Sequence, residues 1–137
     1  MNVYAIAADD MLERAIAAAV AAFPDLGANG LNHPQDWPIE RAHVECAIGF
    51  LRMCMKTQKP NFSSYAIKHF AEKWGRTVGL APYVTNGAAI VAAHALGFVV
   101  ARYPTVTKRY PHGGPNAEVG VARRDIVRLT RPLGYVW

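Results

Sequence analysis

The spacing of apolar residues predicts a helix over residues 64–74. Its apolar positions recur at the intervals of one helix face: Ile67, Phe70, Ala71 and Trp74. Ser63 or Ser64 can supply the side-chain oxygen that caps the first turn, and Gly75 is expected to end the helix. The charged residues of this segment fall elsewhere on the helix.

A second helix is predicted over residues 86–96, after a short turn that contains Gly and Pro. Thr85 or Asn86 precedes it as a capping residue, and Gly97 is expected to end it in a left-handed conformation. The body of this helix is almost entirely Ala, Ile, Val and Leu, so we expect it to be mostly buried.

Two short strands are predicted to follow, at residues 98–103 and 117–122, and to pair as a hairpin with a long tip. Two capped helices joined by a turn are typical of helix-turn-helix folds, and a hairpin after the second helix suggests the winged variant. We therefore predict an α-rich α+β fold with a helix-turn-helix-like core and a C-terminal β-hairpin, which makes it winged-helix-like.

The N-terminal part is predicted to contain two more helices. The first covers about residues 10–23, with Asp9 or Asp10 as its cap, and a loop rich in Gly, Asn and Pro follows at 24–38. The next helix starts at the end of this loop and continues to about Lys56. It is apolar on two sides, which indicates a central helix that is packed on two sides.

The chain length fits one compact domain. Residues 1–35 are expected to form an N-terminal helix and loop, and residues 36–137 the winged-helix-like body. The tail at 123–137 mixes Arg with apolar side chains, and we expect it to add an edge strand or to pack on the central helix.

The two cysteines, Cys46 and Cys54, lie eight residues apart on the predicted central helix. The helical rise separates them by about 12 Å, whereas a disulfide needs Cα atoms within about 7 Å. We therefore expect two reduced core residues in a cytoplasmic protein. Acids precede the first apolar run, so no signal peptide is predicted, and caps and breakers within residues 77–101 argue against a membrane span.

The net charge of +5 is unevenly distributed. Residues 1–61 contain five Lys or Arg against seven Asp or Glu, whereas residues 62–137 contain ten against three. A basic C-terminal half favours contact with a polyanion such as a nucleic acid.

The sequence does not indicate an enzyme, a metal site or a cofactor. His43 and Cys46 lie one helical turn apart, but the second ligand pair of a structural zinc site is not evident. The acids are too scattered to assign an acid–base pair, and no Gly-x-Ser-x-Gly elbow occurs. The loop at 112–116 lacks the spacing of a phosphate-binding loop and suits a hairpin tip. A binding protein is the remaining expectation.

Basic residues near the hairpin are the strongest functional candidates, because ammonium and guanidinium groups neutralise phosphates and tyrosines can stack or donate hydrogen bonds. A solvated surface that keeps the protein soluble would use the same residues. Arg128 and Arg131 belong to this basic cluster. For DNA or RNA, we predict contacts through Lys68, His69, Lys73, Thr85, Asn86, Arg102, Lys108, Arg109, Tyr110, Arg123 and Arg124.

The predicted helix at 86–96 contains no Arg, Lys or Gln. A helix that reads bases in the major groove normally presents several polar side chains near its N-terminus. Base-specific reading is therefore disfavoured, whereas contact between the hairpin and the phosphate backbone is not. Winged-helix folds also serve purely in protein contacts, so a protein partner and a homodimer stay open.

Four short motifs between residues 63 and 121 form a pattern: Ser-Ser-Tyr-x-x-Lys-His at 63–69, Val-x-Asn-Gly-Ala at 84–88, Gly-Phe at 97–98 and Pro-Asn-Ala at 115–117. This pattern resembles that of small proteins encoded by phages and mobile elements. The resemblance implies a phage protein that acts in the cytoplasm of a bacterial host. Some phage proteins of this size act against host defences, so it adds an alternative, an anti-CRISPR-like inhibitor that binds a host nucleoprotein complex.

Overall fold

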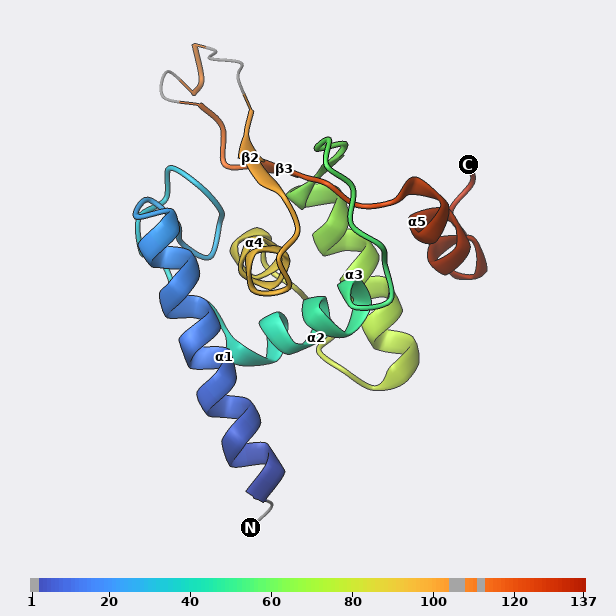
Figure 1. Cartoon of the computed structure of the whole chain (residues 1–137), viewed down its shortest axis with the longest axis horizontal. Coiled ribbons are helices and arrows are strands. Elements are labelled where there is room, and N and C mark those ends of the chain that lie inside the picture. Colours follow the sequence, from blue (N-terminus) through green and yellow to red (C-terminus); the bar gives the residue numbers. More distant parts are fainter. Residues whose placement is uncertain (1–2, 104–107, 111–112) are drawn as a thin grey trace.

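The computed structural model describes residues 3–103, 108–110 and 113–137, and within these ranges it shows an α+β fold. Helices dominate, and a three-stranded antiparallel sheet packs beside them (Figure 1). The elements follow in the order α1 (Val3–Ala22), α2 (Arg41–Leu51), β1 (Phe62–Ser63), α3 (Ser64–Val78), α4 (Asn86–Ala95), β2 (Val100–Arg102), β3 (Ala117–Val119), α5 (Arg123–Thr130) and the 3₁₀ helix η1 (Arg131–Leu133). The predicted α-rich fold with a β-hairpin is confirmed.

Helix α4 lies at the centre of the molecule and packs against α1, α2 and α3 (Figure 1). Every residue from Asn86 to Ala93 is buried, as expected for a helix that is apolar all round. The Thr85 hydroxyl accepts a hydrogen bond from the Ala88 N–H (3.2 Å), and Gly97 follows the helix with φ of 80°. The predicted cap, burial and end of this helix are confirmed, and α2, α3 and α4 all pack against one another.

The sheet has the strand order β1–β3–β2, so β3 lies in the middle. Val119 of β3 is opposite both Phe62 of β1 and Val100 of β2. The predicted hairpin pairing is confirmed with shorter strands, whereas β1 has only two residues and leaves no periodic signal in the sequence. The order α2–β1–α3–α4–β2–β3 matches the helix–strand–helix–helix–strand–strand connectivity of a winged helix.

Helices α1 and α2 do not have the predicted boundaries. Helix α1 begins upstream of the pair Asp9–Asp10, so these acids lie inside the helix and do not cap it. Helix α2 begins at Arg41, after the predicted start, and ends at Leu51, before the predicted end. The chain then turns back toward the sheet. The bridge between Lys56 and Val121 then extends the antiparallel pairing beyond β3.

Helix α3 continues through Gly75, its predicted end, and stops before Gly79, whose φ of 76° suits a helix terminus. Packing explains the internal glycine, since a Cβ at Gly75 would lie 2.4 Å from the Cys46 Sγ of α2. The two helices therefore approach closely at this point. The predicted Ser63 cap is confirmed, because its Oγ accepts a hydrogen bond from the Ala66 N–H (3.0 Å).

Residues 123–137 form α5 and η1, so the prediction of an edge strand is wrong. The apolar residues of this tail recur three and four positions apart, which suits a helix. Helix α5 packs beside α3, and its Asp125 Oδ2 accepts a hydrogen bond from the N–H of Met55, in the segment that follows α2 (2.9 Å). The C-terminal Trp137 returns onto the core, with its ring centroid 5.8 Å from that of Phe70.

The loop between α1 and α2 is tied to the base of the hairpin. The Leu31 N–H donates to the Pro115 carbonyl (2.9 Å), and the Asn32 Nδ2 donates to the Gly113 carbonyl (2.7 Å). Helix α1 packs on α4 and α2 at the same time. The N-terminal segment is thus part of the wall around α4.

Candidate nucleic-acid interface

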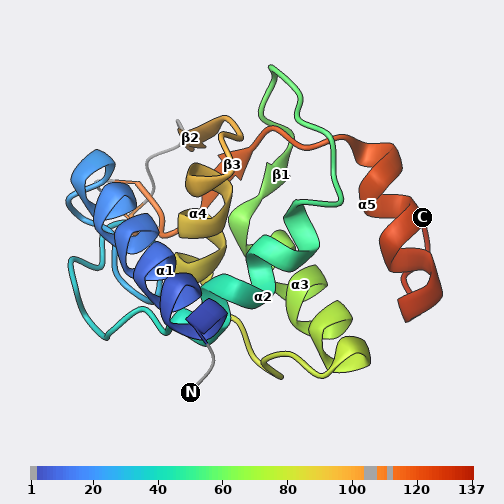
Figure 2. The ribbon, with the colours of Figure 1, turned by 60° about the horizontal axis from the view of Figure 1, so that its bottom comes forward.

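The start of α4, where a helix-turn-helix protein presents its reading residues, is covered in this protein. The Gly87 N–H donates to the Ala28 carbonyl (2.9 Å), and a Cβ on Gly87 would lie 2.0 Å from the Gly27 carbonyl oxygen. Helix α1 lies in front of α4 (Figure 2). Helix α4 therefore offers no surface that could enter a groove of a nucleic acid.

Thr85 and Asn86, both predicted to contact phosphates, have structural partners instead. Asn86 is buried, and its Nδ2 donates to the Pro115 carbonyl (3.1 Å) and to the Asn116 Oδ1 (2.9 Å). The Thr85 hydroxyl is used in the cap of α4. Burial argues against the predicted contact of Asn86, which holds α4 to the base of the hairpin, whereas Thr85 is half-buried and its hydroxyl fixes the start of α4.

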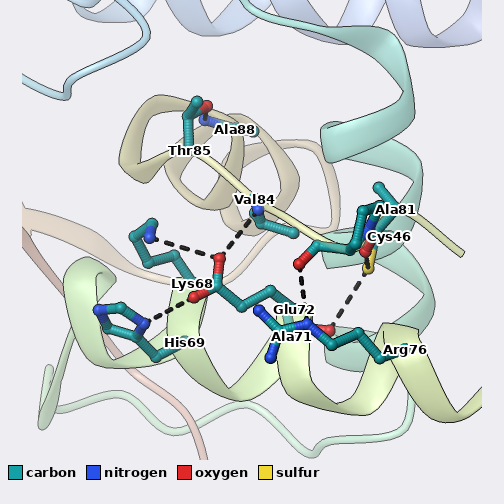
Figure 3. A network of polar contacts seen from close by, with 11 residues as sticks. Cys46, Lys68, His69, Ala71, Glu72, Arg76, Ala81, Val84, Thr85 and Ala88 are labelled. Carbon is teal, nitrogen blue, oxygen red and sulfur yellow. Dashed lines mark hydrogen bonds and ion pairs between the residues drawn. The ribbon is translucent and has the colours of Figure 1, made fainter.

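Lys68, a third predicted contact, is buried in a polar network that joins α3 to the segment before α4 (Figure 3). Its Nζ lies 3.4 Å from the Glu72 Oε2 and 4.6 Å from the centroid of the Tyr83 ring. Glu72 also accepts a hydrogen bond from the Val84 N–H (3.0 Å), and its Oε1 lies 2.7 Å from the His69 Nδ1. Removing the ammonium would leave a buried carboxylate, so Lys68 serves the fold and the prediction is corrected.

The described residues contain no group of three or more His, Cys, Asp or Glu that could hold a metal ion. Both cysteines are free, and burial raises the pKa of Cys46 to about 11 and of Cys54 to about 12. Their thiols therefore stay protonated and weakly nucleophilic at neutral pH. Burial likewise lowers the pKa of His43, which favours its neutral form.

Arg102, at the end of β2, is exposed but already paired. Its guanidinium donates two hydrogen bonds to the Asp25 carboxylate, one of them 2.9 Å from Nη1 to Oδ2, and it lies 5.7 Å from the centroid of the Phe23 ring. The bonded guanidinium lowers the pKa of Asp25 to about 2. Arg102 therefore fastens β2 to the N-terminal loop, and its charge is balanced within the protein.

The wing, residues 103–116, carries the next predicted contacts. Lys108 and Arg109 are exposed, whereas Tyr110 is half-buried, and the Arg109 guanidinium lies 5.3 Å from the centroid of the Tyr110 ring. His112 lies outside the described residues. The described part of the wing thus offers two cations and two aromatic rings, Tyr103 and Tyr110.

A second basic surface surrounds α5. Arg124, Arg128 and Arg131 follow one another at i, i+4 and i+7, which places them on one exposed face of the helix and of the turn after it. Two aromatic rings support the neighbouring cations, since the Arg123 guanidinium lies 5.1 Å from the Trp137 centroid and the Lys73 Nζ lies 4.8 Å from that of Tyr135. We call this set the α5 surface: Lys73, Arg123, Arg124, Arg128 and Arg131.

The α5 surface brings three predicted contacts together, Lys73, Arg123 and Arg124. Arg128 and Arg131 were not assigned contacts, although their helical spacing from Arg124 in the sequence could have identified them. Figures 1 and 2 show that the hairpin leaves the body at one end of the molecule and α5 lies at the other. The basic cluster of the sequence is therefore two separate surfaces.

Exposed carboxylates are confined to one part of the described chain, the residues before position 62. From residue 62 on, nine Lys and Arg side chains are exposed, and no carboxylate in the described residues is, because Glu72 and Asp125 are buried and Glu118 is half-buried. The exposed carboxylates belong to α1 and to the beginning and first half of α2: Asp9, Asp10, Glu13, Glu40 and Glu45. The charge imbalance between the two parts of the sequence is thus also present on the surface of the protein.

No protein-family model, curated protein or solved structure matches this chain. Among the described residues, no helix combines the length and the apolar character needed to cross a bilayer.

Proposed function

We propose that this protein binds nucleic acid through phosphate contacts at the α5 surface, with the wing as a second contact. The observation that supports it is the exposed arginine face of α5, which has no exposed carboxylate near it in the sequence from residue 62 on. Within the described residues, Arg128 is the one member of this surface in an ion pair, with Asp125 at 3.2 Å. Guanidinium groups on a helix face bind phosphate oxygens and release counterions.

The same geometry favours binding without base reading. Helix α4 is enclosed, and the exposed polar side chains of the α5 surface are cations, which contact backbone phosphates more readily than they discriminate bases. The resemblance of residues 63–121 to phage and mobile-element proteins supports a setting in a bacterial cytoplasm, where the ligand is DNA or RNA.

Fluorescence anisotropy with labelled single-stranded DNA, duplex DNA and RNA of one sequence tests the proposal at two salt concentrations. We expect binding at low salt that weakens steeply as salt rises. The variant R124Q/R131Q should reduce the slope of log K against log salt by about two, one for each lost phosphate contact. The variant K108Q/R109Q measures the share of the wing in the same way.

The matched control is R14Q/R41Q, which removes the same charge from exposed arginines that pair with Asp10 and Glu13. It should leave the salt slope nearly unchanged. No binding of any of the three ligands at low salt would refute the proposal. If R124Q/R131Q and R14Q/R41Q reduce the salt slope equally, then net charge, and not the α5 surface, drives the binding.

A second candidate is inhibition of a host defence complex through protein contact. It is favoured by two exposed tyrosines that flank the buried Lys68, Tyr65 with 51% and Tyr83 with 53% of their surface accessible. Tyr and Arg are frequent anchors of protein interfaces. A stoichiometric protein partner that remains bound in a nuclease-treated pull-down, and is lost in Y65A/Y83A, would favour this candidate. Recovery only with nucleic acid would exclude it.

A further inference from the structure

An apolar groove of about 670 Å³ lies between α1, α2 and the end of α4, on a different part of the molecule from the α5 surface. Met11 and Ala15 form one wall, and Ile48 and Leu96 form the other. Met11 has 66% of its surface accessible, which is high for a large apolar side chain beside a groove. This is the kind of surface that proteins cover with a partner.

Two charges of opposite sign lie on the α2 side of the groove. Glu45 and Arg52 are seven residues apart, so they share a helix face about 10 Å apart, with Ile48 between them. Both are exposed, and neither forms an ion pair with any described residue. By contrast, the nearby Arg14 and Arg41 are paired, with Asp10 and Glu13.

This pattern is complementary to itself. A two-fold axis that passes near Ile48 and reverses α2 places Glu45 of one copy opposite Arg52 of the other, and the pairing occurs twice. A surface that pairs with its own copy in this way is the requirement for an isologous dimer interface. Because Glu45 and Arg52 line the groove, the same contact also covers its apolar side chains.

We propose that the protein forms a two-fold homodimer through this groove, with reciprocal Glu45–Arg52 pairs across the interface. The first turns of α1 extend past the rest of the body in Figure 1. Helix α5 lies at the other end of the body, and the dimer therefore leaves both α5 surfaces exposed. The proposal does not depend on the proposed function.

Sedimentation velocity or light scattering after gel filtration measures the oligomeric state directly. The wild type should have twice the monomer mass of 15.0 kDa at micromolar concentrations and dissociate on dilution. E45R and R52E each create two like-charge contacts per dimer, and each should raise the dissociation constant about tenfold or more. Both side chains are exposed, so the variants should keep the wild-type circular dichroism spectrum.

Rescue distinguishes the proposed pairing from a general charge effect. An equimolar mixture of E45R and R52E should associate again, because each copy then faces opposite charges, and the double variant E45R/R52E should form homodimers. A wild type that stays monomeric across the concentration range overturns the proposal. So does a dimer that neither single variant weakens, or one that the mixture fails to restore, since another surface or a different protein would then cover the groove.

Discussion

Helices α4 and α5 are consecutive α-helices of the chain, and they differ sharply in their exposure to solvent. Helix α4 begins where a reading helix is expected, yet residues 86–93 are buried and loop 24–38 lies against its first turn. Helix α5 comes from a tail that was expected to add an edge strand or to pack on the central helix, and it presents arginines along one face. Helix order alone therefore does not show which helix is exposed, and the proposal of a binding surface at α5 rests on the distribution of charge over the folded chain.

The two helices are stabilised in different ways. Helix α4 is held on all sides, so a change at its contacts disturbs several elements together. Helix α5 buries Ile126 and Thr130 and leaves its arginines outside. Changes around α4 should therefore cost stability, whereas changes on the outer face of α5 should cost binding.

The substitution G87A should have the largest effect. The added Cβ would lie 2.0 Å from the Gly27 carbonyl oxygen, so the N-terminal loop must move away from α4. We expect a loss of about 3 kcal/mol in the free energy of unfolding, measured by urea denaturation. The control G114A places a Cβ at an ordinary 3.7 Å from the Tyr110 ring and should be nearly neutral. Similar stabilities of the two variants would contradict the tight cover over α4.

E72Q should have the second-largest effect on stability. The substitution removes the charge opposite the buried Lys68 ammonium, and we expect a loss of about 2–3 kcal/mol in the free energy of unfolding. The double variant K68M/E72Q should be more stable than E72Q alone, since no unpaired charge remains. If K68M/E72Q instead loses the sum of the two single effects, the ion pair does not couple these residues.

The Asp25–Arg102 pair should contribute about 1 kcal/mol, because Arg102 has 46% of its side chain exposed. The folded-state pKa of Asp25 is depressed from 3.8 to about 2. Its contribution is therefore complete above the unfolded value and is lost as the pH falls toward about 2. Urea midpoints measured at falling pH should drop less steeply for D25N than for the wild type. Parallel pH profiles would argue against the pair.

The α5 variant R124Q/R131Q should have the smallest effect on stability, within about 0.5 kcal/mol, because both side chains are exposed. Thermal denaturation checks this alongside the anisotropy titration. A large loss of stability would mean that these arginines hold α5 to the body, and any loss of binding could not then be assigned to lost phosphate contacts.

The sequence predicted the parts of the fold that rest on local signals. The Ser63 and Thr85 caps, the apolar run of α4 and Gly97 depend on neighbouring residues, and the structure confirms them. The cover over α4 was not predictable in this way, because Ala28 and Gly87 meet across a long stretch of chain. No local pattern records such a contact.

The sequence predicted only part of the candidate site, because the rest again depends on contacts between distant residues. Lys68 and Lys73 lie on one helix and are equivalent by charge, but Lys68 is buried beside Glu72 and Lys73 is exposed beside Tyr135. Arg102 and Arg124 are likewise alike in sequence, whereas Arg102 alone is held by a carboxylate from the N-terminal loop. The sequence shows which residues are charged, but it does not show which of them are exposed and not already held by a carboxylate.

The hydrogen bonds between the N-terminal loop and the base of the hairpin affect when the chain can complete its fold during synthesis. The Asn32 amide and the Gly113 carbonyl that it bonds are 81 residues apart, so the ribosome must make nearly the whole chain before this contact closes. Contacts of such long sequence separation form late in folding. Until then, the loop between α1 and α2 lacks its bonds to the base of the hairpin, and incompletely packed chains of this kind are prone to aggregate.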